Sequence, residues 1–486
     1  MLVLTDLPTC PGLFYGSRAR DGILSRMRIP GGILNTQQCL LIAHLIDNYS
    51  TGWIQITNRA NLQIREIHSE IPPEVWHNLQ ELGLASRLVE VDPIRNIMAS
   101  PTAGIDRQKL LDTRPLVTAW DDYLQTHPEL SELSAKFSVG FDGGELVSIR
   151  DRPNDILLVA QRRSSSSEIW FRLHLNSNPQ NSGDTGILIQ PSQAMSVLGA
   201  LANVYLEYTK IKPRIDRKNP RLRHLLADWG IESYLEQVQQ NLPFLLQRIA
   251  IASSEKFIPN YQHLGIHPQQ QPGFSYIGIA LPLGRLESKQ LRNLANLAQN
   301  FAGGTLRLTP WQNLLISDIP NSQLFEVKQQ ITDCGFHWST TNLDSCLVAC
   351  AGSSGCASAM TDTQSHALAT VKDLAQKLQI DRPINIHFSG CEKSCAQHHP
   401  IDITLVGIQI QHGNEIIPGY DIYAGKTESP FGRQIFQGVR VTEIASSMNK
   451  LLRIYQRLRS PDESFGELID RSAIDQLQQW FKSESS

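Results

Sequence analysis

Four cysteines in the last third of the chain have the spacing of a metal-binding set. Cys350 and Cys356 enclose five residues, Cys391 and Cys395 enclose three, and a long segment separates the two pairs. Glycines lie within the first pair and directly before the second, so the backbone can wrap closely around an inorganic core. Four thiolates are the usual ligand set of a [4Fe–4S] cluster.

Structural zinc and ordinary buried thiols are the two alternatives. Four cysteines also suit zinc, but zinc ribbons favour pairs separated by two residues, and neither pair has that spacing. Half of the chain's 8 cysteines lie in this one stretch, which core packing alone does not require. The sequence therefore favours an iron–sulfur cluster.

The other cysteines are expected to be structural. Cys346 opens an apolar run that predicts a strand, and Cys10, Cys39 and Cys334 are isolated in the sequence. The N-terminal residues lack the basic and apolar pattern of a signal peptide. We therefore expect a cytoplasmic protein whose thiols stay reduced and available to metal.

Length and composition predict a globular protein of several domains. A chain of 486 residues is too long for one small core. The formal net charge of -3 gives no basic field for nucleic acid, and no apolar run approaches the length of a membrane span. We therefore expect neither a nucleic-acid partner nor a membrane partner.

An internal repeat organises the chain. Residues 23–67 align without gaps with residues 275–319, and thirteen of the forty-five aligned positions are identical. Each copy predicts a strand, a turn with Pro and Gly, an amphipathic helix, a glycine and a returning strand. This β-α-β unit is compatible with half of a ferredoxin-like layer in an α+β protein. A duplication is therefore expected.

Further elements are predicted outside the repeat. Helices are expected at residues 112–124, 192–209, 442–459 and 473–481, and strands at 137–141, 155–160, 169–173 and 401–410. Residues 216–241 are helical and highly charged, and could carry a linker.

The two copies differ in charge. Arginines 26, 28, 59 and 65 of the first copy stand where the second has Gly278, Ala280, Trp311 and Ser317. Arginine binds carboxylates bidentately and keeps its charge when partly buried. We interpret the set as a pocket for a large polyanion on the first half, facing a cluster held by the second. For any single arginine, pairing with a nearby surface carboxylate is the alternative.

Several motifs resemble the sirohaem-dependent nitrite and sulfite reductase superfamily. They are the two cysteine pairs, RMRIPGG (26–32), TNRANLQ (57–63) and TPWQNL (309–314). The resemblance covers most of the chain and implies an α+β architecture of two pseudo-twofold-related halves. It implies ferredoxin-like half-domains at residues 1–92 and 251–335. It also implies α/β sirohaem-type domains at 93–250 and 336–486, the last carrying the cysteines.

The resemblance also implies ligands, although it identifies no catalytic residue. The four cysteines of the two pairs would bind the cluster, and Cys395 would also bridge to the sirohaem iron. The implied tetrapyrrole-binding residues are Arg26, Arg59, Asn61, Gln63, Arg65, Arg95, Lys136, Gln312 and Asn313.

Sequence between these motifs is similar to precorrin-3B synthases of the aerobic cobalamin pathway. The similar stretches are CPGL (10–13), ASPTAGID (99–106), AKFSVGFDGG (135–144), SGCEKSCAQHHP (389–400) and PDESFGELIDR (461–471). That branch keeps the cluster and binds precorrin-3A as substrate in the tetrapyrrole site. The similarity implies an O2-dependent monooxygenase that hydroxylates C20 of precorrin-3A and forms a γ-lactone.

This interpretation implies further cofactors and partners. Electrons would come from a donor such as ferredoxin or a reductase. A mononuclear non-haem iron would activate O2, and His387, His398 and His399 are its candidate ligands because they lie near the second cysteine pair. The alternative for all three is a surface or hydrogen-bonding role.

A sirohaem-containing reductase of nitrite or sulfite, with ferredoxin as donor, is the alternative from the same superfamily. Sirohaem and precorrin-3A both carry many carboxylates, so the arginines suit either. Sulfite-reducing members have a second lysine two residues after the position of Lys136, where this chain has Ser138. That difference argues against sulfite more than against nitrite. A non-catalytic redox or metabolite sensor is a third possibility, but no regulatory module is recognisable.

Overall fold

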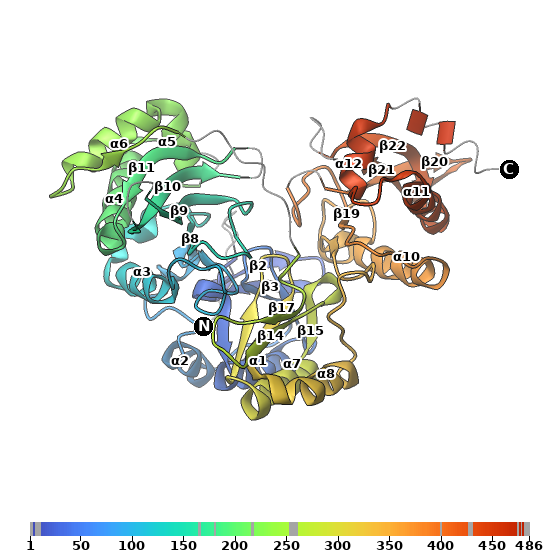
Figure 1. Cartoon of the computed structure of the whole chain (residues 1–486), viewed down its shortest axis with the longest axis horizontal. Coiled ribbons are helices and arrows are strands. Elements are labelled where there is room, and N and C mark those ends of the chain that lie inside the picture. Colours follow the sequence, from blue (N-terminus) through green and yellow to red (C-terminus); the bar gives the residue numbers. More distant parts are fainter. Residues whose placement is uncertain are drawn as a thin grey trace. The chain divides into compact units, whose positions relative to one another are not determined.

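The fold is that of a computed structural model, which describes residues 3–4, 11–163, 167–178, 181–214, 218–251, 261–398, 401–425, 431–473, 476–477 and 479–480. The chain forms two compact units (Figure 1). The first comprises residues 1–18, 23–278 and 286–335, and the second comprises residues 19–22, 279–285 and 336–486. Each unit has its own sheets and its own hydrophobic core.

The predicted repeat is present as two copies of one arrangement. The first copy consists of β3 (Gly22–Met27), β4 (Ile33–Asn35), α1 (Thr36–Tyr49), β5 (Trp53–Ile56) and β6 (Leu62–Ile67). The second consists of β14 (Phe274–Ile279), β15 (Arg285–Glu287), α7 (Ser288–Phe301), β16 (Thr305–Leu308) and β17 (Leu314–Pro320). Each element of the second copy begins 252 residues after its counterpart. The duplicated α+β fold predicted from the sequence is confirmed.

Each copy also contains a strand beyond the predicted β-α-β unit. In the first copy, β6 pairs antiparallel with both β3 and β5. The two outer strands are therefore parallel but separated by β6, as in a split β-α-β arrangement. The turn before β6 carries Arg59, and β6 itself carries Gln63, so this third strand positions part of the predicted tetrapyrrole set.

Local sequence explains where the repeated helix begins and ends. The side chain of Asn35 accepts a hydrogen bond from the Gln38 N–H, and the Gln38 side chain accepts one from the Asn35 N–H, so a capping box starts α1. Cys39, Ile42 and Ile46 turn one face of the helix into the core. Gly52, at φ +81°, lets the chain reverse into β5.

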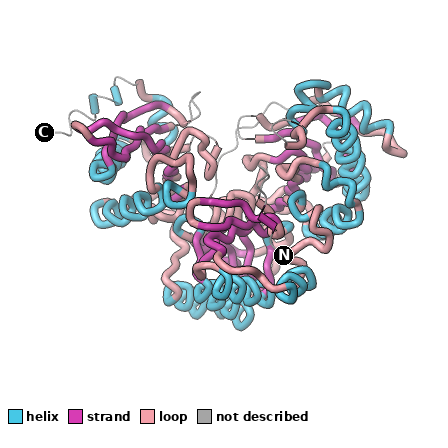
Figure 2. The backbone as a smooth tube through the Cα atoms, turned by 180° about the vertical axis from the view of Figure 1, so that it is seen from behind, coloured by secondary structure: helices cyan, strands magenta, loops and turns pink. Residues whose placement is uncertain are grey.

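The two copies exchange strands. One sheet has the order β1-β2-β3-β6-β5-β15 and the other β13-β14-β17-β16-β4, where β1 is Val3–Leu4, β2 is Tyr15–Ala19 and β13 is Gly265–Pro268. Each copy therefore completes the sheet of the other with its own short strand. Matching hydrogen bonds hold the exchange, from Thr36 N–H to Gly304 O at 3.2 Å and from Ser288 N–H to Gly52 O at 2.8 Å. Helices α1 and α7 lie side by side along these sheets in both views (Figures 1 and 2).

A larger α/β layer follows the first copy. Its sheet has the order β12-β11-β10-β9-β8-β7, with bounds β7 (Ile97–Ala99), β8 (Val139–Asp142), β9 (Asn154–Arg162), β10 (Ile169–Ser177), β11 (Asp184–Ile189) and β12 (Gln247–Arg248). The strands β7, β8 and β9 are parallel, and the others are antiparallel. Helices α3 (Arg114–Thr126) and α4 (Ala194–Ile211) bury Trp120 and Tyr205 against this sheet.

The C-terminal part repeats this plan. Its sheet has the order β18-β19-β20-β21-β22, with bounds β18 (Leu347–Ala349), β19 (Ile386–Ser389), β20 (Ile403–His412), β21 (Glu415–Ala424) and β22 (Arg433–Arg440). Here too the first three strands are parallel and the last two antiparallel. Helices α10 (Thr363–Lys377), α11 (Ile444–Leu458) and α12 (Phe465–Arg471) complete its core. Shorter helices are α2 (Pro73–Glu81), α8 (Leu324–Asp333) and α9 (Gly352–Gly355).

Residues 216–241 are helical as predicted, but the suggestion that they carry a linker is wrong. They contain α5 (Leu222–Trp229) and α6 (Ile231–Gln240), which bury Leu225, Tyr234 and Val238 in the core beside the first α/β sheet. The charged residues of α5 and α6, such as Asp228 and Glu232, are exposed, which is why composition alone suggested a linker. The helix expected at residues 473–481 falls partly outside the described residues.

The helices of the described residues are unlike those that span membranes. Within the described ranges, none of them combines the length and the apolar character that crossing a lipid bilayer requires.

The close approach of the two copies can be tested at Gly32, which has φ +72°. A Cβ at Gly32 would lie 2.9 Å from the Leu308 carbonyl oxygen of β16, whereas Gly83, at φ +71°, has no atom within 4 Å of such a Cβ. Both replacements by alanine share the cost of a left-handed residue, about 1–2 kcal/mol. We expect Gly32→Ala to lower the free energy of unfolding by a further ~2 kcal/mol because backbone must move. Urea denaturation of the two variants measures the difference, and equal losses would contradict the close approach.

Candidate functional site

The four predicted cluster cysteines follow the carboxyl ends of two parallel strands. Cys350 comes directly after β18, and its N–H donates to the Phe388 carbonyl of β19 at 3.1 Å. Cys391 lies just beyond the end of β19. Cys356 follows the short helix α9, where its N–H donates to the Gly352 carbonyl at 2.8 Å. The sheet therefore fixes one cysteine of each pair, and short turns carry the others.

Glycines leave room where the two cysteine loops meet. The Gly390 N–H donates to the Cys350 sulfur at 3.1 Å. A Cβ at Gly390 would lie 2.6 Å from the Ala359 Cβ and 3.4 Å from the Cys350 sulfur, so a larger residue would displace the loop. Gly352 adopts φ +66°, which other residues rarely adopt. These glycines therefore allow the two cysteine loops to approach each other closely; wrapping around an inorganic core stays a prediction.

The four thiols are close enough to influence one another. Burial raises the pKa of the Cys395 thiol, and the charges of Cys350, Cys391 and Cys356 raise it further, whereas Lys393 lowers it. A thiolate surrounded by other thiolates is unfavourable without a cation to balance them. This donor set is therefore suited to a positively charged inorganic group.

The geometry of the four cysteines bears on the zinc alternative and on the cluster prediction. Among the described residues, no group of three or more His, Cys, Asp or Glu side chains converges as the ligands of one metal ion do. In a [4Fe–4S] cluster each cysteine binds a different iron, so the sulfurs stand further apart than ligands of one zinc. Of the histidines predicted as ligands of a mononuclear iron, His387 is buried on β19, His398 is exposed, and His399 lies outside the described residues.

The other cysteines lie elsewhere in the core or near the surface. Burial raises the pKa of the Cys39 thiol to about 12, and burial also raises the pKa of Cys346. Both thiols therefore stay protonated and behave as apolar side chains. Cys334 is partly exposed, and Cys10 lies outside the described residues.

On the first unit, three residues of the predicted tetrapyrrole set come together. Arg26 and Gln63 are opposite each other on β3 and β6, and the Arg26 guanidinium donates to the Gln63 side-chain oxygen at 3.2 Å. Arg59 donates to the Pro153 carbonyl at 2.8 Å and to the Asn154 side-chain oxygen at 3.0 Å. Burial lowers the pKa of Arg59 to about 10; Asp155 opposes this effect, and the charges of Arg221 and Arg26 add to it.

Asp155 and Arg221 belong to the same charge network and were missed in the sequence. Asp155 is only 3% exposed, and an Arg221 nitrogen lies 3.6 Å from one of its oxygens. The Ser138 hydroxyl donates to the other Asp155 oxygen at 3.3 Å. Asp155 is the first residue of a predicted strand, and Arg221 lies in the stretch interpreted as a linker. Because the two residues are far apart in the sequence, no local pattern predicted that they pair. The departure at Ser138 was the only hint.

The remaining predicted residues are placed in different surroundings. Arg95 is buried and donates to both oxygens of Asp121, at 2.7 and 2.8 Å, so ligand binding would require that pair to open. Asn61 accepts the Ile29 N–H at 2.8 Å and holds a turn. Arg65 and Asn313 are buried, Gln312 donates to the Ile56 carbonyl at 3.0 Å, and Lys136 is exposed.

The first α/β layer has polar residues where the second has cysteines. Ser100 directly follows β7 as Cys350 follows β18, and Asp106 stands six residues later, as Cys356 does. The Ser100 hydroxyl donates to the Val147 carbonyl at 2.8 Å, and Asp106 accepts the Leu146 N–H at 3.1 Å. These loops are thus held to each other by the protein's own hydrogen bonds, at the positions equivalent to the first cysteine pair.

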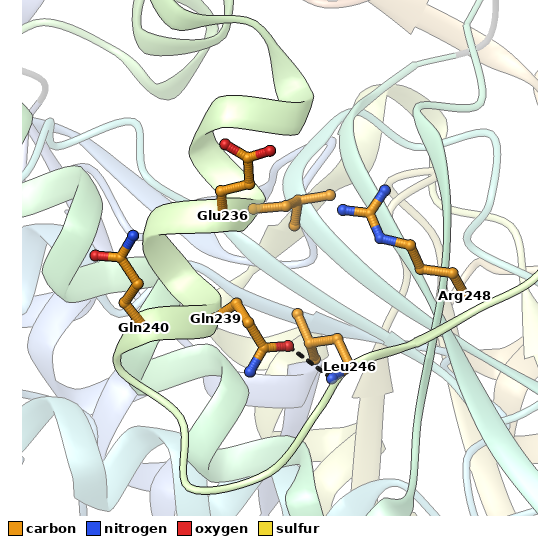
Figure 3. Close-up of a pocket in the computed structure, with 6 residues that line it drawn as sticks. Glu236, Gln239, Gln240, Leu246 and Arg248 are labelled. Atoms are coloured by element: carbon orange, nitrogen blue, oxygen red, sulfur yellow. Dashed lines mark hydrogen bonds between the residues drawn. The ribbon is translucent and has the colours of Figure 1, made fainter.

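A cavity of about 310 Å³ lies away from all of these residues (Figure 3). It is lined by Leu235, Glu236, Gln239, Gln240, Leu246 and Arg248. The Gln239 side-chain oxygen accepts the Leu246 N–H at 2.8 Å across its lower edge. No predicted cluster or tetrapyrrole residue lines this cavity.

Comparisons with known families match nearly the whole chain. The nitrite and sulphite reductase 4Fe-4S domain matches residues 90–245 and 345–486. The nitrite/sulfite reductase ferredoxin-like half domain matches residues 15–82 and 267–334. Both models match twice, as the internal duplication requires.

Similar curated proteins are ferredoxin–nitrite reductases. The one from Synechococcus elongatus is 30% identical, over 91% of this chain and 88% of its own length. A chloroplastic one from Arabidopsis thaliana is 28% identical, over 91% of this chain and 78% of its own length. One from Haloferax mediterranei is 25% identical, over 96% of this chain and 85% of its own length. Among solved structures, the NirA protein of Mycobacterium tuberculosis shares the fold, with a TM-score of 0.79 at 23% identity over 94% of this chain and 84% of that one.

These findings overturn the interpretation as a precorrin-3B synthase. The similar proteins carry the name ferredoxin–nitrite reductase, and that name does not fit a monooxygenase of cobalamin synthesis. The short stretches that suggested the synthase do not outweigh similarity along the whole chain. The chain belongs to the nitrite and sulfite reductase family, with both its 4Fe-4S domain and its ferredoxin-like half domain.

Proposed function

We propose that this protein is a ferredoxin-dependent nitrite reductase that holds a [4Fe–4S] cluster and sirohaem. The observation that carries the proposal is the 30% identity to a ferredoxin–nitrite reductase over 91% of the chain. The two cysteine pairs and the arginine-rich half supply the donor types that these two groups need. Ferredoxin is the proposed electron donor and nitrite the proposed substrate.

The residues of this chain are proposed to bind and orient these groups. Cys350, Cys356, Cys391 and Cys395 would hold the cluster. Arg26, Arg59 and Gln63 would bind carboxylates of the tetrapyrrole, since guanidinium groups match carboxylates in charge and geometry. When bound, the cluster and sirohaem supply single electrons and an iron that can take nitrite as a ligand. The four segments 1–92, 93–250, 251–335 and 336–486 are proposed as the working domains.

The environment of Ser138 favours nitrite over sulfite. Its hydroxyl is buried and bonded to Asp155, so this position offers no second cation to a bound anion. Sulfite carries more negative charge than nitrite and needs more positive charge around it. A single lysine at position 136, exposed and close in sequence, is better matched to the smaller charge.

The proposal can be tested with protein purified without air. We expect haem-type Soret and long-wavelength absorption bands with about five irons per chain. With reduced ferredoxin, nitrite should disappear and ammonium should appear in equal amounts, six electrons being consumed for each. Protein that carries both groups but forms no ammonium from nitrite would contradict the proposal.

Serine variants of the four cysteines test the cluster ligands. Replacing Cys350, Cys356, Cys391 or Cys395 by serine should remove most of the iron and labile sulfide, because serine oxygen is a poor ligand for an iron–sulfur cluster. Cys334→Ser serves as the control, since Cys334 is partly exposed and lies in the first unit. Iron analysis measures the outcome. Full iron content in any of the four variants would exclude that cysteine as a required ligand.

Arg59→Gln tests the tetrapyrrole site. A charge-assisted hydrogen bond contributes about 1.5–3 kcal/mol, so sirohaem should bind at least tenfold more weakly while the cluster stays. Arg248→Gln is a matched control, because Arg248 is an exposed arginine that pairs with Glu232 and does not belong to the predicted tetrapyrrole set. Sirohaem extracted per chain, compared with iron and sulfide, gives the result. Equal sirohaem in both variants would remove Arg59 from the site.

A further inference from the structure

Thr363 contacts Cys350 in two ways. Its hydroxyl donates to the Cys350 carbonyl oxygen at 2.8 Å and lies 3.6 Å from the Cys350 sulfur. Thr363 is the first residue of α10, but the helix does not need its hydroxyl as a cap. The preceding Asp362 caps the helix, because its carboxylate accepts the Ser365 N–H. The hydroxyl of Thr363 is therefore committed to the cysteine.

The loops are built so that Thr363 can come this close. A Cβ at Gly352 would lie 2.7 Å from the Thr363 nitrogen and 2.9 Å from its hydroxyl oxygen. Only glycine at position 352 leaves space for the start of α10. The Gly390 N–H reaches the Cys350 sulfur at 3.1 Å from the neighbouring loop. The sulfur thus has a backbone donor and a hydroxyl beside it.

The other half of the duplication provides an internal comparison. Thr113 precedes α3 as Thr363 begins α10, and each follows an aspartate, Asp112 or Asp362. Thr113 is fully buried, yet its hydroxyl has no hydrogen-bond partner among the described residues. In this half Ser100 stands where Cys350 stands in the other. The same threonine therefore has hydrogen-bond partners only in the copy that has the cysteine.

We infer that Thr363 is a positioning residue for Cys350 and, through it, for the cluster. Its hydroxyl donates to the Cys350 carbonyl and so fixes the backbone of the cysteine. The Cys350 sulfur accepts the Gly390 N–H, and hydrogen-bond donors to cluster sulfurs stabilise the more negative reduced state and raise the reduction potential. Removing the Thr363 hydroxyl frees the Cys350 backbone, so this N–H···S hydrogen bond should weaken, the potential should fall and the cluster should be held less firmly. The inference rests on the cluster of the proposed function but not on its substrate.

The test compares variants of the two threonines in protein that carries the cluster. Thr363→Val keeps the shape without the hydroxyl, Thr363→Ala removes the side chain, and Thr363→Ser keeps the hydroxyl. Thr113→Val is the matched control in the other half. Two quantities are measured: the midpoint potential of the cluster, by redox titration followed by electron paramagnetic resonance, and the rate at which a chelator removes iron. Using both Val and Ala keeps the test valid if one variant fails to fold.

The hydroxyl-free variants should show a reduction equilibrium about tenfold less favourable, which is ~59 mV for one electron. They should also lose iron several-fold faster. Thr363→Ser and Thr113→Val should match the wild type in both measurements. If the variants without the hydroxyl kept the wild-type potential and rate of iron loss, the inference about Thr363 would be overturned and the proposed function would stand. The same would follow if Thr363→Ser lost iron as fast as Thr363→Ala. Wild-type protein that takes up no cluster would overturn the proposed function as well.

Discussion

The exchange of short strands between the two repeat copies is the constraint on which the first unit depends. A sheet edge presents unpaired N–H and C=O groups that can pair with a strand from elsewhere, and folded proteins commonly cover such edges. Here β4 and β15 cover the edges, each from the opposite copy. The hydrogen bonds Thr36–Gly304 and Ser288–Gly52 are counterparts of each other, so neither sheet is complete alone. The two copies are thus one folding unit, and side chains on both have fixed relative positions.

The two copies share one backbone arrangement but differ in the side chains at equivalent positions. Arg59 and Trp311 occupy the same place in the repeat, 252 residues apart, and both meet the segment that leads into β9. Arg59 bonds to backbone and amide oxygens there, whereas the Arg152 guanidinium lies 5.1 Å from the Trp311 ring. Trp311 also stacks on His263, whose pKa burial lowers to about 3, so that imidazole stays neutral. One copy presents charge, and the other fills the equivalent space with stacked rings.

Features that depend on neighbours in sequence were predictable, and features that depend on distant partners were not. The repeat was visible because identities persist at one offset, and the cysteine pairs because their spacing is short and local. The strand exchange was not, because no residue in β4 indicates which sheet it joins. Asp155 with Arg221, and Thr363 with Cys350, are pairings of separate elements and have no local signal. The roles of the cysteines and of the tetrapyrrole set remain predictions.

The choice between synthase and reductase could not be made from the arginines, and the reason is physical. A guanidinium recognises a carboxylate at the periphery of a tetrapyrrole, and those carboxylates do not report whether the ring holds iron or awaits hydroxylation. One of the short motifs that favoured the synthase, residues 99–106, is held by Arg307 through the carbonyls of Pro101 and Ala103. The residues of such a motif are constrained by packing, so their sequence can reflect the fold that they share with related enzymes and not only the reaction. Similarity over the whole chain averages across these constraints, which is why it discriminates where individual motifs did not.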